Sequence, residues 1–334
     1  MLVLPVQRTI DSEWVSFMLH QLIRHFMPLT RYPYTGERVP CPVCACDRAT
    51  QIARIDRRFK LLPTVACDHC GLLYTNPMPS DAELSDYYTR LYRLDYQGAA
   101  SAPKQRHLGK RAREAAMRSS RVGSLLAPGS RTLDFGCGTG EFLSSLRALG
   151  HDAHGFEPGQ TYGTYARQLH GERVAVKGWE QVRYEAQFDL VSCFHVLEHL
   201  RNPIAALRQM AAWTRPGGLV YVEVPNLGNA DRNKGFGGFH FAHVVGFNHH
   251  NLVLAGALAG LRPRSVIAPT RIIFEHGLDV DVMREADRGR SLALELYASG
   301  RATTSYLHYQ MSKASGRDRM LRHAAPRPAD SVPV

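Results

Sequence analysis

A glycine-rich turn directly behind a buried strand constrains the fold of this 334-residue chain more than any other feature. Residues 131–135, RTLDF, form a short apolar run, and Gly136, Gly138 and Gly140 follow it at alternate positions. The turn lacks the Lys-Ser/Thr pair of a phosphate-binding loop, and its third glycine does not have the spacing of the dinucleotide fingerprint. Asp134, at the end of the strand, would repel a pyrophosphate and attract a cationic amine.

A second acidic side chain closes the next predicted strand, HDAHGFE at 151–157. At this position Glu157 can accept hydrogen bonds from both hydroxyls of a ribose. The two acidic strand ends therefore predict a ligand with a free amine and an unphosphorylated ribose. S-adenosylmethionine has both groups, whereas a nicotinamide dinucleotide fits less well.

Predicted strands and helices alternate from residue 131 onward. The strands lie at 131–135, 151–157, 173–178, 188–194 and 219–225, and the helices at 141–150, 159–171 and 203–218. This order predicts an α/β fold with a doubly wound, mostly parallel sheet and right-handed crossovers. Ligands of such sheets bind at the carboxyl ends of the strands, where the glycine turn and both carboxylates lie.

Four of the seven cysteines form two CxxC pairs, which are separated by 22 residues. Two such pairs at this spacing predict a tetrahedral four-thiolate zinc site of the structural kind. The predicted ligands are Cys41, Cys44, Cys67 and Cys70, and Cys46 and His69 are additional candidates. A module of about 40 residues cannot build a core alone, so zinc would supply most of its folding energy.

Five segments resemble, in order, the class I S-adenosylmethionine-dependent methyltransferases. They are LDFGCGTGEFL, GFEPG, FDLVSCFHVLEHLRNP, TRPGGLVYVEVPN and HFAHVVGFNHHNL, and they span about 130–262. The resemblance implies a Rossmann-like fold that binds S-adenosylmethionine. It implies a methionine end lined by Asp134, Gly136, Gly138 and Gly140, a ribose held by Glu157, an adenine beside Gly178 and Trp179, and a methyl group near His195. Trp179 could equally be a packing residue, and Cys137 and Cys193 are expected to be buried and without chemistry.

The segment at 67–88, CDHCGLLYTNPMPSDAELSDYY, resembles the N-terminal zinc-binding part of bacterial methyltransferases that modify deoxysugars, polysaccharide units and natural products. This second resemblance implies a small-molecule acceptor, such as a hydroxyl of a sugar, glycolipid or natural-product intermediate. The sugar C-methyltransferases of that family carry a further large C-terminal domain. Only about 70 residues follow position 262, so we expect that domain to be absent or vestigial.

Methyl transfer to a hydroxyl needs a group that removes the acceptor's proton, and histidine suits this task near neutral pH. By resemblance, His199 matches the histidine of the family's NxxxH segment, and His243 matches the last histidine of its YHEH segment. His240, Phe241 and Ala242 stand where that segment has tyrosine, histidine and glutamate. This departure favours O-methyl transfer with a histidine base over deprotonation of a sugar carbon. The candidate catalytic residues are His199, His243 and His240.

Other interpretations of the histidines remain open. His240, His243 and His249 could form a three-histidine metal site. His249 and His250 could instead begin an exposed helix, and His199 could be a hydrogen-bonding residue at a helix start.

The chain has a formal net charge of +11, and much of the excess lies in runs at 104–121 and 313–327. An RNA base methyltransferase that grips phosphates is therefore an alternative function. A solvated helix face and a loose tail explain the same charges, and no aromatic residues interleave with these runs as stacking platforms. Nucleic acid is thus a possible but not a favoured partner. A sugar C-methyltransferase and a non-catalytic partner subunit are further alternatives.

We expect five parts along the chain. They are an amphipathic helix and linker (1–36), a zinc-binding module (37–80), a helical connector (81–128), the methyltransferase domain (129–285), and a C-terminal helix with a basic, disordered tail (286–334). No apolar run reaches the ~18–20 residues that span a bilayer, and we expect no secretory signal. The CxxC pattern is typical of a cytoplasmic protein. The sequence does not indicate an oligomeric state.

Overall fold

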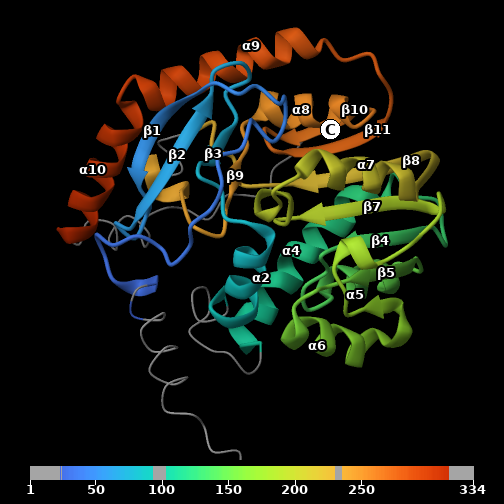
Figure 1. The fold of residues 1–334 in the computed structure, drawn as a ribbon. Coiled ribbons are helices and arrows are strands. Elements are labelled where there is room, and N and C mark those ends of the chain that lie inside the picture. Colours follow the sequence, from blue (N-terminus) through green and yellow to red (C-terminus); the bar gives the residue numbers. More distant parts are fainter. Residues whose placement is uncertain (1–22, 24, 93–102, 230–234, 316–334) are drawn as a thin grey trace, which may run out of the picture.

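The structure is a computed structural model that describes residues 23, 25–92, 103–229 and 235–315 (Figure 1). Most of the helix predicted at 11–27 and the predicted tail beyond residue 315 lie outside the described residues. Two β-sheets organise the part of the chain that is described, one of seven strands and one of four.

The seven-stranded sheet has the strand order β10-β11-β8-β7-β4-β5-β6. Its strands are β4 (Arg131–Phe135), β5 (Asp152–Phe156), β6 (Val174–Ala175), β7 (Phe188–Phe194), β8 (Thr214–Glu223), β10 (Leu261–Ala268) and β11 (Arg271–His276). The pairs among β4 to β8 are parallel, whereas β11 is antiparallel to both β8 and β10. The predicted α/β fold with a mostly parallel sheet is confirmed.

Helices cover both faces of this sheet. On β8, Leu219 and Tyr221 belong to one apolar cluster and Val220 and Val222 to another, because successive side chains of a strand point to opposite faces. The first cluster includes residues of α4, α5 and α6, and the second includes residues of α7 and α8. These helices are α4 (Gln105–Gly123), α5 (Glu141–Ala148), α6 (Gln160–His170), α7 (Pro203–Trp213) and α8 (His249–Leu258). The sheet is therefore doubly wound.

The helix predicted over 203–218 begins as expected but is shorter. The Asn202 side chain accepts a hydrogen bond from the Ala205 amide at 3.0 Å, and Pro203 occupies the first turn, where its missing N–H has no cost. The predicted end is wrong, because α7 stops at Trp213 and β8 begins at Thr214. Thr214 already pairs with β7, and the proline at 216 has no N–H with which to continue a helix.

The four-stranded sheet is antiparallel and joins two distant parts of the chain. Its order is β1 (Ala49–Ile55), β2 (Leu61–Cys67), β3 (Leu73–Thr75) and β9 (Val245–Gly246). The first three strands come from the cysteine-rich part, whereas β9 lies between β8 and α8. Leu73 pairs with Gly246, and Tyr74 pairs with Val245. The cysteine-rich part is thus hydrogen-bonded to the chain that carries the seven-stranded sheet.

The remaining helical segments complete the described architecture. They are α2 (Asp81–Arg90), the 3₁₀ segments η1 (Gly171–Arg173), η2 (Trp179–Gln181), η3 (Leu197–His199) and η4 (Gly235–Gly238), and the C-terminal α9 (Val282–Ala293), π-helical η5 (Leu294–Ala298) and α10 (Arg301–Ala314). Figure 1 shows α9 and α10 curving over the small sheet. None of the helices built from described residues combines the length and apolarity that crossing a bilayer needs.

Two glycines allow α9 to approach the cysteine-rich part closely. A Cβ on Gly71 would lie 2.2 Å from the carbonyl oxygen of Gly289, and a Cβ on Gly289 would lie 2.5 Å from that of Cys70. Gly71 also has a φ of +68°, which favours glycine. The backbone of α9 is therefore packed directly against the second CxxC turn.

The basic helix α4 is not only a solvated face, which was one prediction from its charges, because one of its arginines is buried. Arg118 is 7% exposed and donates from Nε and Nη2 to Oε2 of Glu223 at 3.0 and 2.8 Å. Its guanidinium carbon lies 4.2 Å from the ring centroid of Phe194. Breaking such a buried pair leaves an uncompensated charge, so Arg118 anchors α4 to the sheet.

Replacing Gly289 with alanine is predicted to destabilise the protein, although alanine favours helix. The new methyl group would meet the Cys70 carbonyl, and relieving the overlap costs about 1–3 kcal/mol. Gly109→Ala in α4 is the matched control, because its methyl group would meet only a flexible arginine end at 3.9 Å, and a gain of up to about 1 kcal/mol is expected. Thermal unfolding of both variants checks the contact, and equal melting temperatures for the two would contradict it.

Candidate active site

The three glycines of the predicted turn all have positive φ, at 77°, 57° and 87° for Gly136, Gly138 and Gly140. A Cβ on Gly136 would lie 2.7 Å from the Val196 side chain, so this position requires glycine. A Cβ on Gly138 would meet nothing within 4 Å. The turn therefore offers bare backbone beside open space at the carboxyl end of β4.

Asp134 and Glu157 converge on this turn. The Asp134 side chain is buried and accepts a hydrogen bond from the Ser192 hydroxyl at 2.7 Å. Burial raises the pKa of the Asp134 carboxyl to about 6. Glu157 accepts from the backbone amides of Gly138 at 3.2 Å and Gly159 at 2.9 Å. Parallel pairing of β4 and β5 thus places two carboxylates at one edge of the sheet.

The other residues assigned to the cofactor lie after β6 and β7. Gly178 precedes η2, and Trp179 is half-buried, with its ring centroid 6.1 Å from that of Phe135. His195 follows β7 with a φ of +57°, and its amide donates to the carbonyl of Glu223 at 2.8 Å. A left-handed conformation in a residue other than glycine costs energy and often marks a functional position.

Two of the three candidate catalytic histidines lie in contact. The rings of His199 and His243 are 4.9 Å apart between centroids, and His240 lies 6.0 Å from His243 and is fully buried. Nδ1 of His199 is 2.7 Å from the carbonyl oxygen of Ala242 and 2.9 Å from the hydroxyl of Tyr88 in α2. Burial lowers the pKa of His243 to about 3, so its imidazole is neutral at pH 7.

Glu198 belongs to this cluster and was missed by sequence reasoning. Its side chain is 2% exposed, and Oε1 lies 3.6 Å from Nδ1 of His195 and 3.8 Å from Nε2 of His199. Burial opposes ionisation, but the interactions with His195 and with the neighbouring imidazoles of His199 and His243 lower the pKa of Glu198 to about 2. The signal was present in FHVLEH, where the glutamate directly precedes the candidate base. Tyr88 had no comparable signal, because only tertiary structure brings α2 to the histidines.

The three-histidine metal site is not formed. His249 begins α8 as predicted, and its Nδ1 lies 2.8 Å from the Pro269 carbonyl instead of joining His240 and His243 in a ligand set. The prediction that His249 and His250 are exposed is also wrong. Both are half-buried, and Nδ1 of His250 lies 2.8 Å from a carboxylate oxygen of Glu285 in α9.

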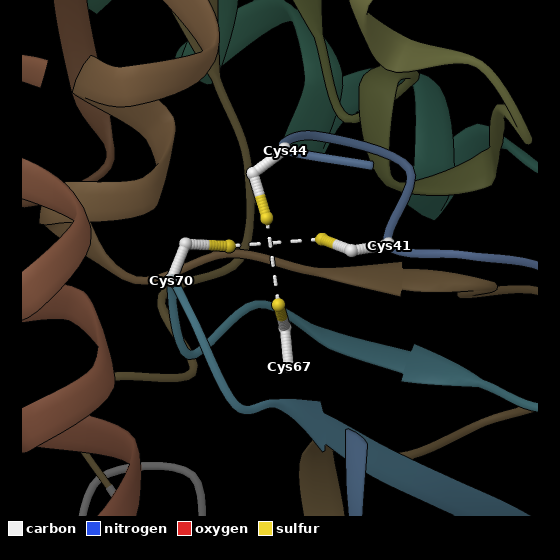
Figure 2. A group of neighbouring side chains, drawn as sticks. All are labelled: Cys41, Cys44, Cys67 and Cys70. Atoms are coloured by element: carbon white, nitrogen blue, oxygen red, sulfur yellow. Dashed lines mark hydrogen bonds between the residues drawn. The ribbon is translucent and has the colours of Figure 1, made fainter. Parts of the chain in front are cut away.

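The four predicted zinc ligands converge, and Figure 2 shows their sulfur atoms pointing toward a common centre. The Sγ atoms of Cys41 and Cys70 are 3.6 Å apart, and those of Cys44 and Cys67 are 3.5 Å apart. Zinc–sulfur bonds of ~2.3 Å in a tetrahedron give sulfur–sulfur distances of ~3.8 Å, so the thiolates fit a zinc ion closely.

The additional candidates lie beside this group but outside it. Cys46 directs its thiol to the carbonyl of Arg48 at 3.6 Å, and His69 donates its backbone amide to the sulfur of Cys67 at 3.4 Å. Cys137 and Cys193 are buried, and burial raises the pKa of both thiols, as expected for residues without chemistry.

Comparisons with known proteins agree with the geometry of the large sheet. Residues 105–265 match the family model described as "Methyltransferase domain". The ubiquinone biosynthesis O-methyltransferases of Aeromonas salmonicida and Bordetella pertussis are each 34% identical over 106 residues, which are 29% of this chain and 44% of each relative. The chain thus spans less than half the length of the curated relatives it matches.

Similar solved structures include DesVI and CalS10. DesVI of Streptomyces venezuelae is 26% identical, with coverage of 35% of this chain and 53% of its own and a TM-score of 0.32. CalS10, an amino pentose methyltransferase from Micromonospora echinaspora, is 19% identical, with coverage of 53% and 98% and a TM-score of 0.41. The family match and the observed sheet topology carry the assignment. Over residues 105–265, which are just under half of the chain, this protein is therefore similar to the class I S-adenosylmethionine-dependent methyltransferases.

Proposed function

We propose that this protein transfers a methyl group from S-adenosylmethionine to a hydroxyl of a small-molecule acceptor. The observation that carries the proposal is the convergence of a bare glycine turn, two carboxylates and a histidine cluster at one edge of the sheet. The chain spans only part of its relatives, so the activity of the whole protein is a proposal.

The residues at the turn fit the cofactor. The buried carboxylate of Asp134 would bind the ammonium group, and Glu157 would bind the ribose hydroxyls. The open space beside Gly138 would admit the methionine end along with Gly136 and Gly140. Gly178 and Trp179 would border the adenine, and His195 would lie near the methyl group. When bound, the cofactor supplies an activated methyl group, and the protein's task is to position the acceptor and remove its proton.

The histidine cluster would carry out that deprotonation. His199 and His243 are the proposed residues, and His240 lies behind them as a buried support. An oxygen acceptor is supported by the name of the similar curated relatives, which are O-methyltransferases. The resemblance of the zinc-binding segment supports a sugar, glycolipid or natural-product intermediate as the acceptor.

We also propose that Cys41, Cys44, Cys67 and Cys70 hold a structural zinc ion. The convergence of the four sulfur atoms supports this, and a closed thiolate set leaves no open position for substrate. Thiolates that bind zinc must stay reduced, which supports the cytoplasm as the location.

Cofactor affinity is predicted to fall in acid, because only the ionised form of Asp134 attracts an ammonium group. With a pKa of about 6, the carboxyl is mostly ionised at pH 7 and mostly protonated at pH 5, so the dissociation constant should rise ~10-fold over that interval. Asp134→Asn should weaken binding about 10- to 100-fold at pH 7 and abolish the pH dependence. Isothermal titration with S-adenosylmethionine measures both effects.

The control for this test is Asp152→Asn, which changes a carboxylate at the opposite, amino end of β5. Its affinity for the cofactor should stay within twofold of the unaltered protein. No binding of S-adenosylmethionine by the unaltered protein at millimolar concentration would refute the proposed function. Equal affinity of the Asp134→Asn variant would refute the assignment of Asp134.

Removal of one zinc thiolate is predicted to loosen the small sheet and α9 together. A thiol-modifying mercurial should release zinc from the unaltered protein. The Cys44→Ser variant should lack this zinc. Amide exchange should then quicken in 41–75 and in α9, which packs against Cys70, while the seven-stranded sheet keeps its protection. Cys46→Ser is the matched control and should retain zinc, since its thiol contacts a carbonyl. Zinc retained in Cys44→Ser, or lost in Cys46→Ser, would overturn the ligand assignment.

A further inference from the structure

The carboxylate of Glu198 is buried, and the described residues leave one of its two oxygens without a hydrogen-bond donor. The side chain is 2% exposed, and Oε2 has no hydrogen-bond partner among them. A buried oxygen that carries negative charge is costly unless a donor or a cation satisfies it. A cation bound by this carboxylate would offset that cost, and the surroundings of its other oxygen, Oε1, indicate where such an ion would lie.

The carbonyl oxygen of Ala242 determines which ring nitrogen of His199 carries a hydrogen. Nδ1 lies 2.7 Å from the carbonyl oxygen of Ala242, which can only accept, so Nδ1 carries the hydrogen. In neutral His199 the lone pair is therefore on Nε2, and Nε2 lies 3.8 Å from Oε1 of Glu198. Two lone-pair atoms at this separation, with no hydrogen between them, leave a place for a positive ion.

The separation of these atoms suits one metal ion. Bonds of ~2.1 Å from nitrogen and from oxygen reach a common ion over distances up to ~4.2 Å, which exceeds 3.8 Å. One ligand atom each from Glu198, His199 and His243 lies within 4.8 Å of the others, so the His243 ring is near enough to join the ion after a small side-chain adjustment. Histidines that bind metals commonly donate their second ring N–H to a carbonyl, as His199 does to Ala242.

We propose that Glu198, His199 and His243 form a second metal site, for a divalent transition-metal ion. Two imidazoles and one carboxylate favour ions such as Zn²⁺, Co²⁺ or Fe²⁺ over Mg²⁺ and Ca²⁺, which take oxygen ligands. Three protein ligands leave positions open, unlike the closed set of four cysteines. The site adjoins the glycine turn, because the side chain of Val196, two residues before Glu198, lies 2.7 Å from where a Cβ on Gly136 would be.

The role of this ion rests on the proposed function. A hydroxyl at an open position of the ion has a lowered pKa, so its proton can leave near pH 7. The proton would pass to the imidazole of His195, which is 39% exposed and borders Glu198. The acceptor oxygen then bonds to the methyl carbon as the carbon–sulfur bond breaks, and its electron pair stays on sulfur. With the ion bound, His199 and His243 would promote the deprotonation as ligands of the ion, and His195 would replace them as the group that accepts the proton.

Titration of metal-free protein with Co²⁺ tests the site without an acceptor. The protein should bind two cobalt ions, of which one shows the sulfur-to-cobalt charge-transfer band of the cysteine site and the other does not. Glu198→Gln and His243→Asn should each weaken the second ion by at least the roughly 10- to 100-fold that loss of an outer partner costs. The cysteine band should persist in both variants, which shows that they fold.

His249→Asn is the matched control, because His249 begins α8 and contacts the Pro269 carbonyl. It should bind both cobalt ions with unchanged affinity. A stoichiometry of one in the unaltered protein, or a second ion unaffected by Glu198→Gln, would overturn the site. Titration with S-adenosylmethionine separates the two proposals. Cobalt binding without cofactor binding refutes the proposed function and leaves the site standing, and the reverse result refutes the site alone.

Discussion

The parallel pairing of β4 with β5 and β7 is the constraint on which the rest of the candidate site depends. In this register Asp134 lies opposite Gly155 on one side and Ser192 on the other. The Ser192 hydroxyl can therefore reach the Asp134 carboxylate, and Glu157, two residues after Gly155, can reach the amide of Gly138. A shift of one residue in either pair would turn these side chains to the opposite face.

The cysteine-rich part is integrated into the fold and shares its core. Its cysteines Cys41, Cys67 and Cys70 belong to the same apolar cluster as Trp213 of α7. The pairing of β3 with β9 and the contact of Gly71 with Gly289 add backbone connections to it. Tyr88 of α2 then reaches His199, so the residues that follow the cysteines contribute to the histidine cluster. The proposed zinc ion would thus stabilise one wall of the candidate active site.

Features that depend on local sequence could be predicted. The glycine turn, the alternation of strands and helices from residue 131, and the CxxC pairs all follow from spacing within a few residues, and the structure has the corresponding elements. The carboxylates at the ends of β4 and β5 could be located for the same reason, although their roles are proposals.

Features that depend on distant contacts could not be predicted. The two residues of β9 have too little pattern to indicate a strand, and their partner β3 lies far away in the sequence. In the sequence Arg118 is one of many basic residues. Only the structure shows that it is buried in an ion pair with Glu223. The sequence places Glu198 beside His199, but only the fold brings His243 to the same place.

The pairing of β3 with β9 has a consequence for biosynthesis. Because ribosomes release the N-terminal part first, β3 remains an open edge until residues 245–246 have emerged. Pairing between segments so far apart in the sequence forms late, because closing the long loop between them costs conformational entropy. Until it forms, an exposed strand edge can pair with another nascent chain. Early capture of a metal ion by the four thiolates would hold β2 and β3 in their folded arrangement during that interval, before their last neighbour exists.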